Sequence, residues 1–246
     1  VFAQWAKTFR APTANELYGR FGGPGTYLRV GNPDLRPEEG NGIDVGARFG
    51  DKQLGGSITY FYSKYHNFIE QQQIAPPGGL YPQGGIVSFR NIPRAEIQGV
   101  EINGQYAFAQ NWLVRGSFAY TRGVNKTDNT FLNSIPPVQG ILAIAYGTDY
   151  WGAEVSTKLA GKRDDVAATT GTNQGFRAPG YAIFNATAWW RPMPQIADLE
   201  LQVGVYNIFD RRYWDAVNVP TGVLAQARDY YSEPGRTVKA TLKYQF

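Results

Sequence analysis

The sequence of 246 residues contains no cysteine and a single histidine, His66. Disulfides, thiolate metal sites and cysteine nucleophiles are therefore excluded, and a metal site with two histidines cannot form within the chain. Charged residues make up only 18% of the sequence, and the formal net charge of +4 is too small to indicate nucleic acid as a partner. No apolar run is long enough to predict a transmembrane helix.

Aromatic residues are abundant, at 15%, and polar and apolar residues alternate in segments of roughly ten residues, which predicts β-strands with two different faces. In residues 99–108, for example, Val100 and Ile102 share one face, whereas Glu101 and Asn103 share the other. The ten predicted strands cover residues 1–6, 43–49, 57–65, 99–108, 112–122, 140–146, 151–160, 181–190, 199–207 and 237–246.

The connections between these strands alternate strictly in length. Long connections are expected at residues 11–41, 69–94, 124–139, 161–180 and 215–235, and short ones at 50–55, 109–111, 147–150 and 191–198. This alternation places all long loops at one end of the sheet, as in transmembrane barrels, and the aromatic residues near strand ends suit the two membrane interfaces. The predicted fold class is therefore an all-β, transmembrane antiparallel β-barrel. Because the chain starts within a strand and an open sheet edge cannot face lipid, we expect further strands upstream.

The most distinctive segment joins the first two predicted strands. It opens with residues 9–12, Phe-Arg-Ala-Pro, and ends with residues 32–38, Asn-Pro-Asp-Leu-Arg-Pro-Glu. Four prolines within the segment predict that no regular strand or helix runs through it. We expect Pro33 and Pro37 to stiffen its descent into the next strand. A long, stiff, aromatic loop between strands is a common place for a binding site.

These two boxes resemble those of TonB-dependent outer-membrane receptors for haem. Further matching pieces follow in order, at residues 91–92, 99–101, 206–214, 234–237 and 244–246. The resemblance covers almost the whole chain and implies a 22-stranded barrel with an N-terminal plug, of which residues 1–246 would supply strands 13–22. The plug and the first strands would lie outside this chain.

The resemblance also implies a function. The protein is expected in the outer membrane of a Gram-negative bacterium, where it binds and imports haem and has no enzymatic activity. Its expected partners are haem or a haem-carrying protein, the TonB complex acting through the plug, and outer-membrane lipid.

By resemblance, the loop at residues 11–41 supplies an axial ligand to the haem iron. Related receptors usually carry a histidine between the two boxes, but this chain has none there. We favour Tyr27 as the iron ligand, because Arg29 two residues later would favour the phenolate form. Tyr18 is the second candidate, and Arg20 and Arg29 are candidates to pair with the haem propionates. An ordinary role as loop aromatics remains open for both tyrosines.

The remaining polar residues give weaker indications of function. His66 ends a predicted strand, and both iron ligation and a surface role remain open for it. Glu101, Glu154 and Glu200 are expected to line a hydrated interior or to form salt bridges that face the plug, rather than to act as paired catalytic acids. The adjacent acids at residues 164–165 are only a weak indication of a cation site.

Three other functions remain open. A receptor for a ferric siderophore or another small nutrient would need no protein ligand to iron. A passive porin-like barrel would need no plug. An outer-membrane hydrolase is the least favoured, because no motif joins a serine, His66 and an acidic residue.

Overall fold

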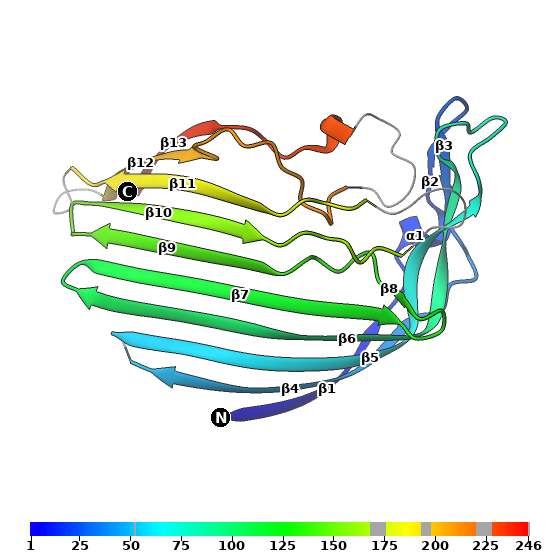
Figure 1. The fold of residues 1–246 in the computed structure, drawn as a ribbon, viewed down its shortest axis with the longest axis horizontal. Coiled ribbons are helices and arrows are strands. Elements are labelled where there is room, and N and C mark those ends of the chain that lie inside the picture. Colours follow the sequence, from blue (N-terminus) through cyan, green and yellow to red (C-terminus); the bar gives the residue numbers. More distant parts are fainter. Residues whose placement is uncertain (52, 168–175, 193–197, 220–227, 246) are drawn as a thin grey trace.

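A computed structural model describes residues 1–51, 53–167, 176–192, 198–219 and 228–245, and the predicted terminal aromatic Phe246 lies outside these ranges. One antiparallel sheet dominates the described residues, and ten of its strands pair in the order β1-β4-β5-β6-β7-β9-β10-β11-β12-β13 (Figure 1). Their bounds are Phe2–Arg10, Glu38–Gly50, Leu54–Ala75, Gly85–Ala109, Trp112–Asn125, Gln139–Gly147, Trp151–Ala160, Tyr181–Trp190, Asp198–Tyr206 and Thr237–Gln245. All ten predicted strands are confirmed.

The predicted arrangement of the connections is confirmed as well. The short connections after β4, β6 and β9 lie at one end of the sheet, where β11 also ends and β12 begins, and the long connections start from the other end (Figure 1). Strands that pair in chain order and in antiparallel fashion must place alternate connections at opposite ends. We call the end with the long connections the loop end.

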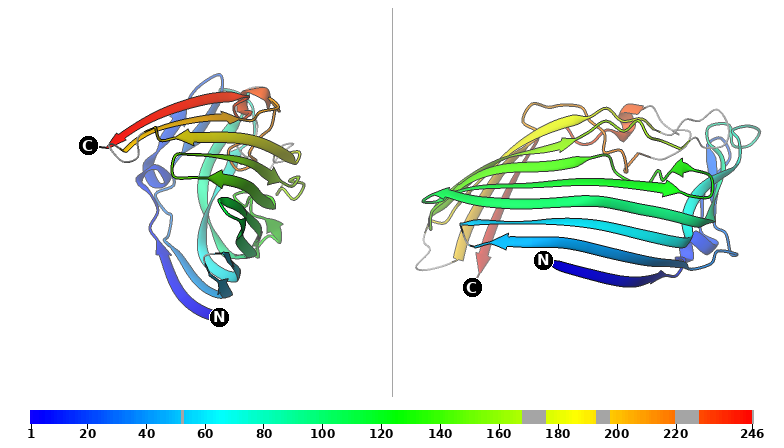
Figure 2. Two further views of the ribbon diagram at one scale, coloured as in Figure 1. Left: turned by 90° about the vertical axis from the view of Figure 1, so that its left-hand side faces the viewer. Right: turned by 60° about the horizontal axis from the view of Figure 1, so that its bottom comes forward.

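The two faces of the sheet differ in chemistry. On one face, the register aligns Tyr60 with Val100 and Val100 with Tyr120, and apolar side chains such as Phe118 remain exposed. The other face carries polar side chains such as Arg115 and lines a hollow. End on, the sheet curves into an open trough (Figure 2). The polar face is therefore the concave, inward face, and the apolar face is the outward one.

The long connection predicted at residues 69–94 is mostly strand. β5 continues to Ala75 and β6 begins at Gly85, so only residues 76–84 of the predicted connection lie outside the two strands. Glu70 pairs in register with Arg90, and Gln72 with Ser88. The prediction was wrong because these extensions mix polar and apolar side chains without a regular alternation, while their backbone groups are still satisfied by the ladder.

The prediction that residues 11–41 hold no regular structure was also wrong. The segment contains the helix α1 (Ala14–Tyr18), the strands β2 (Arg20–Gly22) and β3 (Tyr27–Val30), and the start of β4. Its prolines lie outside the helix and the strands, so they interrupt none of these elements. Pro12 precedes the helix, Pro24 lies in the turn between β2 and β3, and Pro33 and Pro37 lie before β4.

A small apolar core lies at the loop end. Ile92 and Ala95 of β6 are almost fully buried against Leu132, with Phe68 and Ile135 packed around them. The chain after β7 thereby folds inward, and its two-residue strand β8 (Thr130–Phe131) pairs with the end of β7. A short 3-10 helix, η1, spans Arg228–Tyr231. Among the described residues, no helix is long and apolar enough to cross a membrane.

Candidate functional site

The helix α1 begins at a capping box. The Thr13 hydroxyl oxygen accepts a hydrogen bond from the Glu16 backbone N–H at 3.2 Å, and the Thr13 backbone N–H donates to Glu16 Oε2 at 2.7 Å. The spacing of Thr13 and Glu16 is a sequence signal for a helix start, and it outweighs the nearby proline. The box turns the chain sharply at the end of β1.

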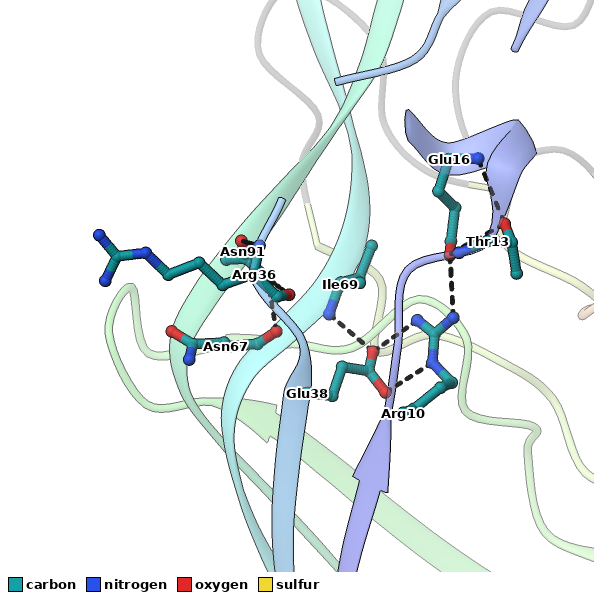
Figure 3. A network of polar contacts seen from close by, with 8 residues as sticks. All are labelled: Arg10, Thr13, Glu16, Arg36, Glu38, Asn67, Ile69 and Asn91. Atoms are coloured by element: carbon teal, nitrogen blue, oxygen red, sulfur yellow. Dashed lines mark hydrogen bonds and ion pairs between the residues drawn. The ribbon is translucent and has the colours of Figure 1, made fainter. Parts of the chain in front are cut away.

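A partly buried ion pair closes the base of the segment, and we call it the Arg10 latch (Figure 3). Arg10 Nε donates to Glu38 Oε2 at 2.7 Å, and Arg10 Nη2 donates to Glu38 Oε1 at 2.7 Å. Arg10 Nη1 also lies 3.0 Å from Glu16 Oε2, and Glu38 Oε1 accepts the Ile69 backbone N–H at 2.8 Å. Because Arg10 belongs to the first box and Glu38 to the second, the latch joins the two boxes.

Glu16 is held in its charged form by this arrangement. Burial acts to raise the pKa of Glu16, but the hydrogen bonds from Arg10 and from Thr13 outweigh it and lower the pKa below the ordinary value. A charged Glu16 stabilises both the start of α1 and the guanidinium of Arg10.

Asn91 fastens the second box to β6 (Figure 3). Its Oδ1 accepts the Arg36 backbone N–H at 2.8 Å, and its Nδ2 donates to the Arg36 carbonyl at 2.9 Å and to the Asn67 carbonyl at 2.7 Å. Asn32 makes a similar contact, because its Nδ2 donates to the Phe89 carbonyl at 2.9 Å. Both ends of the segment are thus fixed to the barrel wall.

The hairpin of β2 and β3 projects from this base and joins β6. β3 pairs in parallel with β6, with Tyr27 opposite Gly85 and Arg29 opposite Val87. The Gly25 backbone N–H donates to the Leu80 carbonyl at 2.8 Å. The first long connection and the β5–β6 extension therefore form one projecting sheet at the loop end (Figure 1).

Tyr27, the favoured iron ligand, is half-buried at the start of β3. Its ring centroid lies 6.1 Å from that of Phe21. A Cβ at Gly84 would lie 2.6 Å from Tyr27 Cβ, so only glycine allows this approach. The ring is therefore held by packing. The iron-ligand role itself stays a prediction.

The other three predicted residues lie on the same projection but are less fixed. Arg29 shares a strand face with Tyr27, and its guanidinium carbon lies 5.6 Å from the centroid of the Phe21 ring. Tyr18 ends α1 and is 73% exposed, and Arg20 begins β2 and is also exposed. No contact recorded among the described residues joins Tyr18 or Arg20 to Tyr27, so the structure groups only Arg29 with it.

His66 is exposed on β5, in register with Glu39 and Arg94. It shares a face with Tyr60, since the two residues are an even number apart on a regular strand, and therefore points outward. This places the imidazole on the opposite side of the wall from the trough.

Two of the three predicted inward carboxylates form ion pairs within the barrel wall. Arg115 Nη2 lies 2.6 Å from Glu154 Oε2, and Arg191 Nη2 lies 2.7 Å from Glu200 Oε2. Glu101 lies near Lys158 in a second inward hollow. In the outer loop, Asp164 pairs with Lys162 at 2.6 Å. The described residues contain no group of three or more acids or histidines placed to hold a metal ion.

Sequence reasoning missed the structural role of the motif at residues 206–214. Asn207 and Asp210 adopt positive φ values of 51° and 52°. Asn207 Nδ2 donates to the Arg211 carbonyl at 2.8 Å, and Asp210 Oδ1 accepts the Arg236 backbone N–H at 2.7 Å. Asparagine and aspartate tolerate this backbone region, and their side chains complete such turns. The motif thus clamps the base of the last long connection.

Comparison with known proteins bears on the fold and the family. The family model described as TonB dependent receptor-like, beta-barrel, matches residues 1–208. The chain is 27% identical to a probable hemoglobin and hemoglobin-haptoglobin-binding protein 4 of Haemophilus influenzae, covering 100% of this chain and 28% of that protein. It is 26% identical to a hemin receptor of Yersinia enterocolitica, covering 100% of this chain and 36% of that protein. The chain thus spans about a third of the length of these relatives.

Two solved structures show the same fold. The copper transporter OprC superimposes with a TM-score of 0.80 at 23% identity, covering 99% of this chain and 36% of that chain. A mutant of the ferric enterobactin receptor PfeA of Pseudomonas aeruginosa superimposes with a TM-score of 0.70 at 23% identity, covering 98% of this chain and 37% of that chain. The sheet therefore matches the C-terminal part of such barrels.

Proposed function

Because this chain belongs to the TonB-dependent receptor family of β-barrels, we propose that it is part of a receptor that binds haem and imports it. Barrels of this family lie in the outer membrane of Gram-negative bacteria, and the family consists of transport receptors rather than enzymes. Two relatives are named for binding hemoglobin and for hemin reception, and these names support haem as the substrate.

The observation that carries the haem proposal is the placement of Tyr27. Its half-buried side chain lies on a projecting strand, beside the Phe21 ring and with its Cβ against the backbone at Gly84. A phenolate is a hard oxygen donor and is a known axial ligand of ferric haem in proteins. A ligand held by packing loses little conformational freedom when it binds iron. Tyr27 is thus our first candidate for the axial ligand, and Tyr18 is the second.

The two arginines of the hairpin are proposed to hold the propionates. Arg29 lies on the same strand face as Tyr27, and Arg20 is exposed on the neighbouring strand. Guanidinium groups form charge-assisted hydrogen bonds with carboxylates, which suits the two acidic groups of haem. The Arg10 latch would keep this hairpin at a fixed height above the barrel wall.

The rest of the receptor is proposed from the open sheet. β1 and β13 each pair on one side only within the described residues, and unpaired strand edges are costly in lipid. We propose that residues 1–246 are strands 13–22 of a 22-stranded barrel and that the remaining strands and an N-terminal plug belong to the same protein. The TonB complex would supply energy through that plug, and a haem-carrying protein is the proposed source of the cargo.

The test is an absorption titration of the intact receptor with ferric haem. Tyr27→Phe keeps the packing against Phe21 but removes the oxygen donor, so we expect loss of the tyrosinate charge-transfer band and at least about tenfold weaker binding. Tyr231→Phe is the matched control, because Tyr231 is also a half-buried phenol and lies in η1, far along the chain. An unchanged spectrum and affinity for Tyr27→Phe would exclude this ligand.

A ferric siderophore is the second candidate substrate. The exposed Arg20 and the aromatic face at Phe21 can hold an anionic iron complex without any protein ligand to the metal. In that case a saturable haem spectrum would be missing, and siderophore binding would survive Tyr27→Phe. A passive porin is distinguished by steady conductance in a planar bilayer, which a plugged receptor does not give.

A further inference from the structure

An ion pair joins the barrel wall to the last long connection at the loop end. Lys158, near the loop end of β10, places its Nζ 3.2 Å from Asp215 Oδ2 in the connection between β12 and β13. The Lys158 side chain is 36% exposed and that of Asp215 is 16% exposed. The pair therefore lies inside the trough but within reach of solvent and of a passing ligand.

This pair differs from the two other inward ion pairs. Arg115 lies 2.6 Å from Glu154, and Arg191 lies 2.7 Å from Glu200. An arginine holds a carboxylate in a fixed, planar geometry, whereas a lysine is a compact charge with three donors on a flexible stem. Because its contact is longer and its donors can rotate, Lys158 can exchange one carboxylate for another more readily.

Further hydrogen-bond donors lie beside the Lys158 ammonium. Its Nζ lies 5.6 Å from the ring centroid of Tyr181 and interacts with the phenol group of that residue. The ring centroid of Tyr213 lies 4.6 Å from that of Tyr181. Lys158 also lines an inward hollow of about 300 Å³, which has room for an acidic group of a ligand. An ammonium beside phenol groups supplies the donors that a carboxylate requires.

The connection does not depend on this ion pair for its shape. Asp215 Oδ1 accepts the Val217 backbone N–H at 3.4 Å, and the Asp215 carbonyl accepts the Asn218 backbone N–H at 3.0 Å, so the turn is closed locally. The Ala216 carbonyl accepts a hydrogen bond from Arg163 Nη1 at 2.7 Å, and both residues are buried. The Asp215 carboxylate can therefore leave the lysine while the connection stays in place.

Nearby charges set the strength with which an anion would be held. Arg163 adds a second, buried cation next to the pair, and its guanidinium donates to two backbone carbonyls, which carry no charge. In the opposite sense, Glu233 acts electrostatically on Tyr181 and Tyr213, and Glu101 lines the hollow. These carboxylates weaken the hold on an anion, which suits a site that a cargo must leave again.

We propose that Lys158 and Tyr181 form a carboxylate-binding subsite that Asp215 occupies in this structure, and that a carboxylate of the cargo replaces Asp215 during import. Asp215 is then an internal substitute for the ligand. Each exchange breaks one ion pair and forms another, so Lys158 is not left without a partner. The inference rests on the proposed import function. Haem propionates and the carboxylates of a siderophore share this chemistry, and the test distinguishes them.

The test uses the intact receptor in detergent and iron-free protoporphyrin IX, which has the two propionates of haem but no metal to bind Tyr27. Asp215→Asn keeps the Oδ1 acceptor of the turn but removes the charge that competes for Lys158. We expect about tenfold tighter porphyrin binding in a fluorescence titration, because the ammonium becomes available to the ligand. The double variant Lys158→Gln, Asp215→Asn is expected to lose this gain, whereas a purely structural ion pair predicts no gain in either variant.

Two controls separate the subsite from general effects of charge. The dimethyl ester of protoporphyrin IX has no free carboxylate and is expected to bind equally to the wild type and to Asp215→Asn. Glu200→Gln removes another inward carboxylate, the partner of Arg191, and is expected to leave porphyrin binding unchanged. Equal tightening of the ester by Asp215→Asn, or an equal gain in Glu200→Gln, would overturn the proposal.

Ferric citrate, a carboxylate-rich iron complex, tests the siderophore as the source and is titrated by calorimetry. Tighter porphyrin binding by Asp215→Asn supports the subsite for haem. Tighter binding of ferric citrate alone supports the subsite for a siderophore and contradicts haem as the cargo. If Asp215→Asn tightens neither ligand, the subsite is refuted, whereas a haem spectrum that depends on Tyr27 would still support the proposed function.

Discussion

Substitution of Arg10 by methionine is expected to release the base of the projecting hairpin. The change keeps most of the apolar stem but removes two 2.7 Å hydrogen bonds to Glu38 and the contact with Glu16. Glu38 is only 8% exposed, and its carboxylate would retain one described donor, the backbone N–H of Ile69 at 2.8 Å. An uncompensated buried charge is the main cost of such a substitution.

The magnitude follows from the burial of the two partners. Breaking a fully buried pair costs about 3 to 5 kcal/mol. The Arg10 side chain is 43% exposed, so solvent screening reduces the expected loss to about 2 to 3 kcal/mol. Glu38→Gln should cost less, because glutamine still accepts hydrogen bonds from Arg10 and Ile69 and leaves no buried charge.

Hydrogen exchange of peptides from residues 13–37 in the intact receptor measures this loss. A loss of 2 to 3 kcal/mol corresponds to about 100-fold faster exchange for Arg10→Met. Arg212→Met is the control, since its pair with Asp229 is exposed on both sides, with side-chain exposures of 66% and 61%. The reasoning is refuted if Arg10→Met changes exchange no more than the control, or if Glu38→Gln proves the more damaging of the two latch variants.

Three further predictions concern the same loop. Gly84→Ala would place a Cβ 2.6 Å from Tyr27 Cβ and should weaken ferric haem binding in the absorption titration, whereas Gly104→Ala, whose nearest neighbour atom lies 3.9 Å away, should not. The pKa of Glu16 is lowered in the folded loop, so the stability that its charged form contributes is present above about pH 4.5 and is lost as the pH falls through the folded pKa. Hydrogen exchange of the loop, corrected for intrinsic rates, should therefore become faster on acidification. A corrected exchange rate that does not change with pH would contradict this. Asn91→Ala removes three hydrogen bonds and should reduce the stability of the docked second box by about 2 kcal/mol. A protease should therefore cleave the second box faster than in the wild type, and an unchanged cleavage rate would argue against this.

The strand prediction succeeded where lipid and water meet the two faces of the same strand. In β7, Trp112 and Phe118 must differ from Arg115 and Ser117, because each face meets a different solvent. Beyond the membrane this constraint ends. Residues 71–73 are three glutamines in a fully paired strand, and nothing in their pattern distinguishes them from a loop.

The candidate site was only partly predictable. Tyr27 and Arg29 were identified from their place between two boxes, and their shared face follows from strand geometry. The packing of Tyr27 against Gly84 could not be predicted, because it depends on a parallel pairing between β3 and β6 that brings together residues far apart in the chain. The start of α1 at Thr13 had a readable signal in the capping-box spacing.

The sequence by itself determined the antiparallel barrel wall, the end at which the long loops lie, and the family. These features depend on the two-residue period of strands and on local motifs, and both can be recognised from residues that are neighbours in the sequence. Only the tertiary structure decided that Arg10 binds Glu38 and that the first long connection docks on β6. Each of these depends on the register between distant strands, and no local pattern specifies that register.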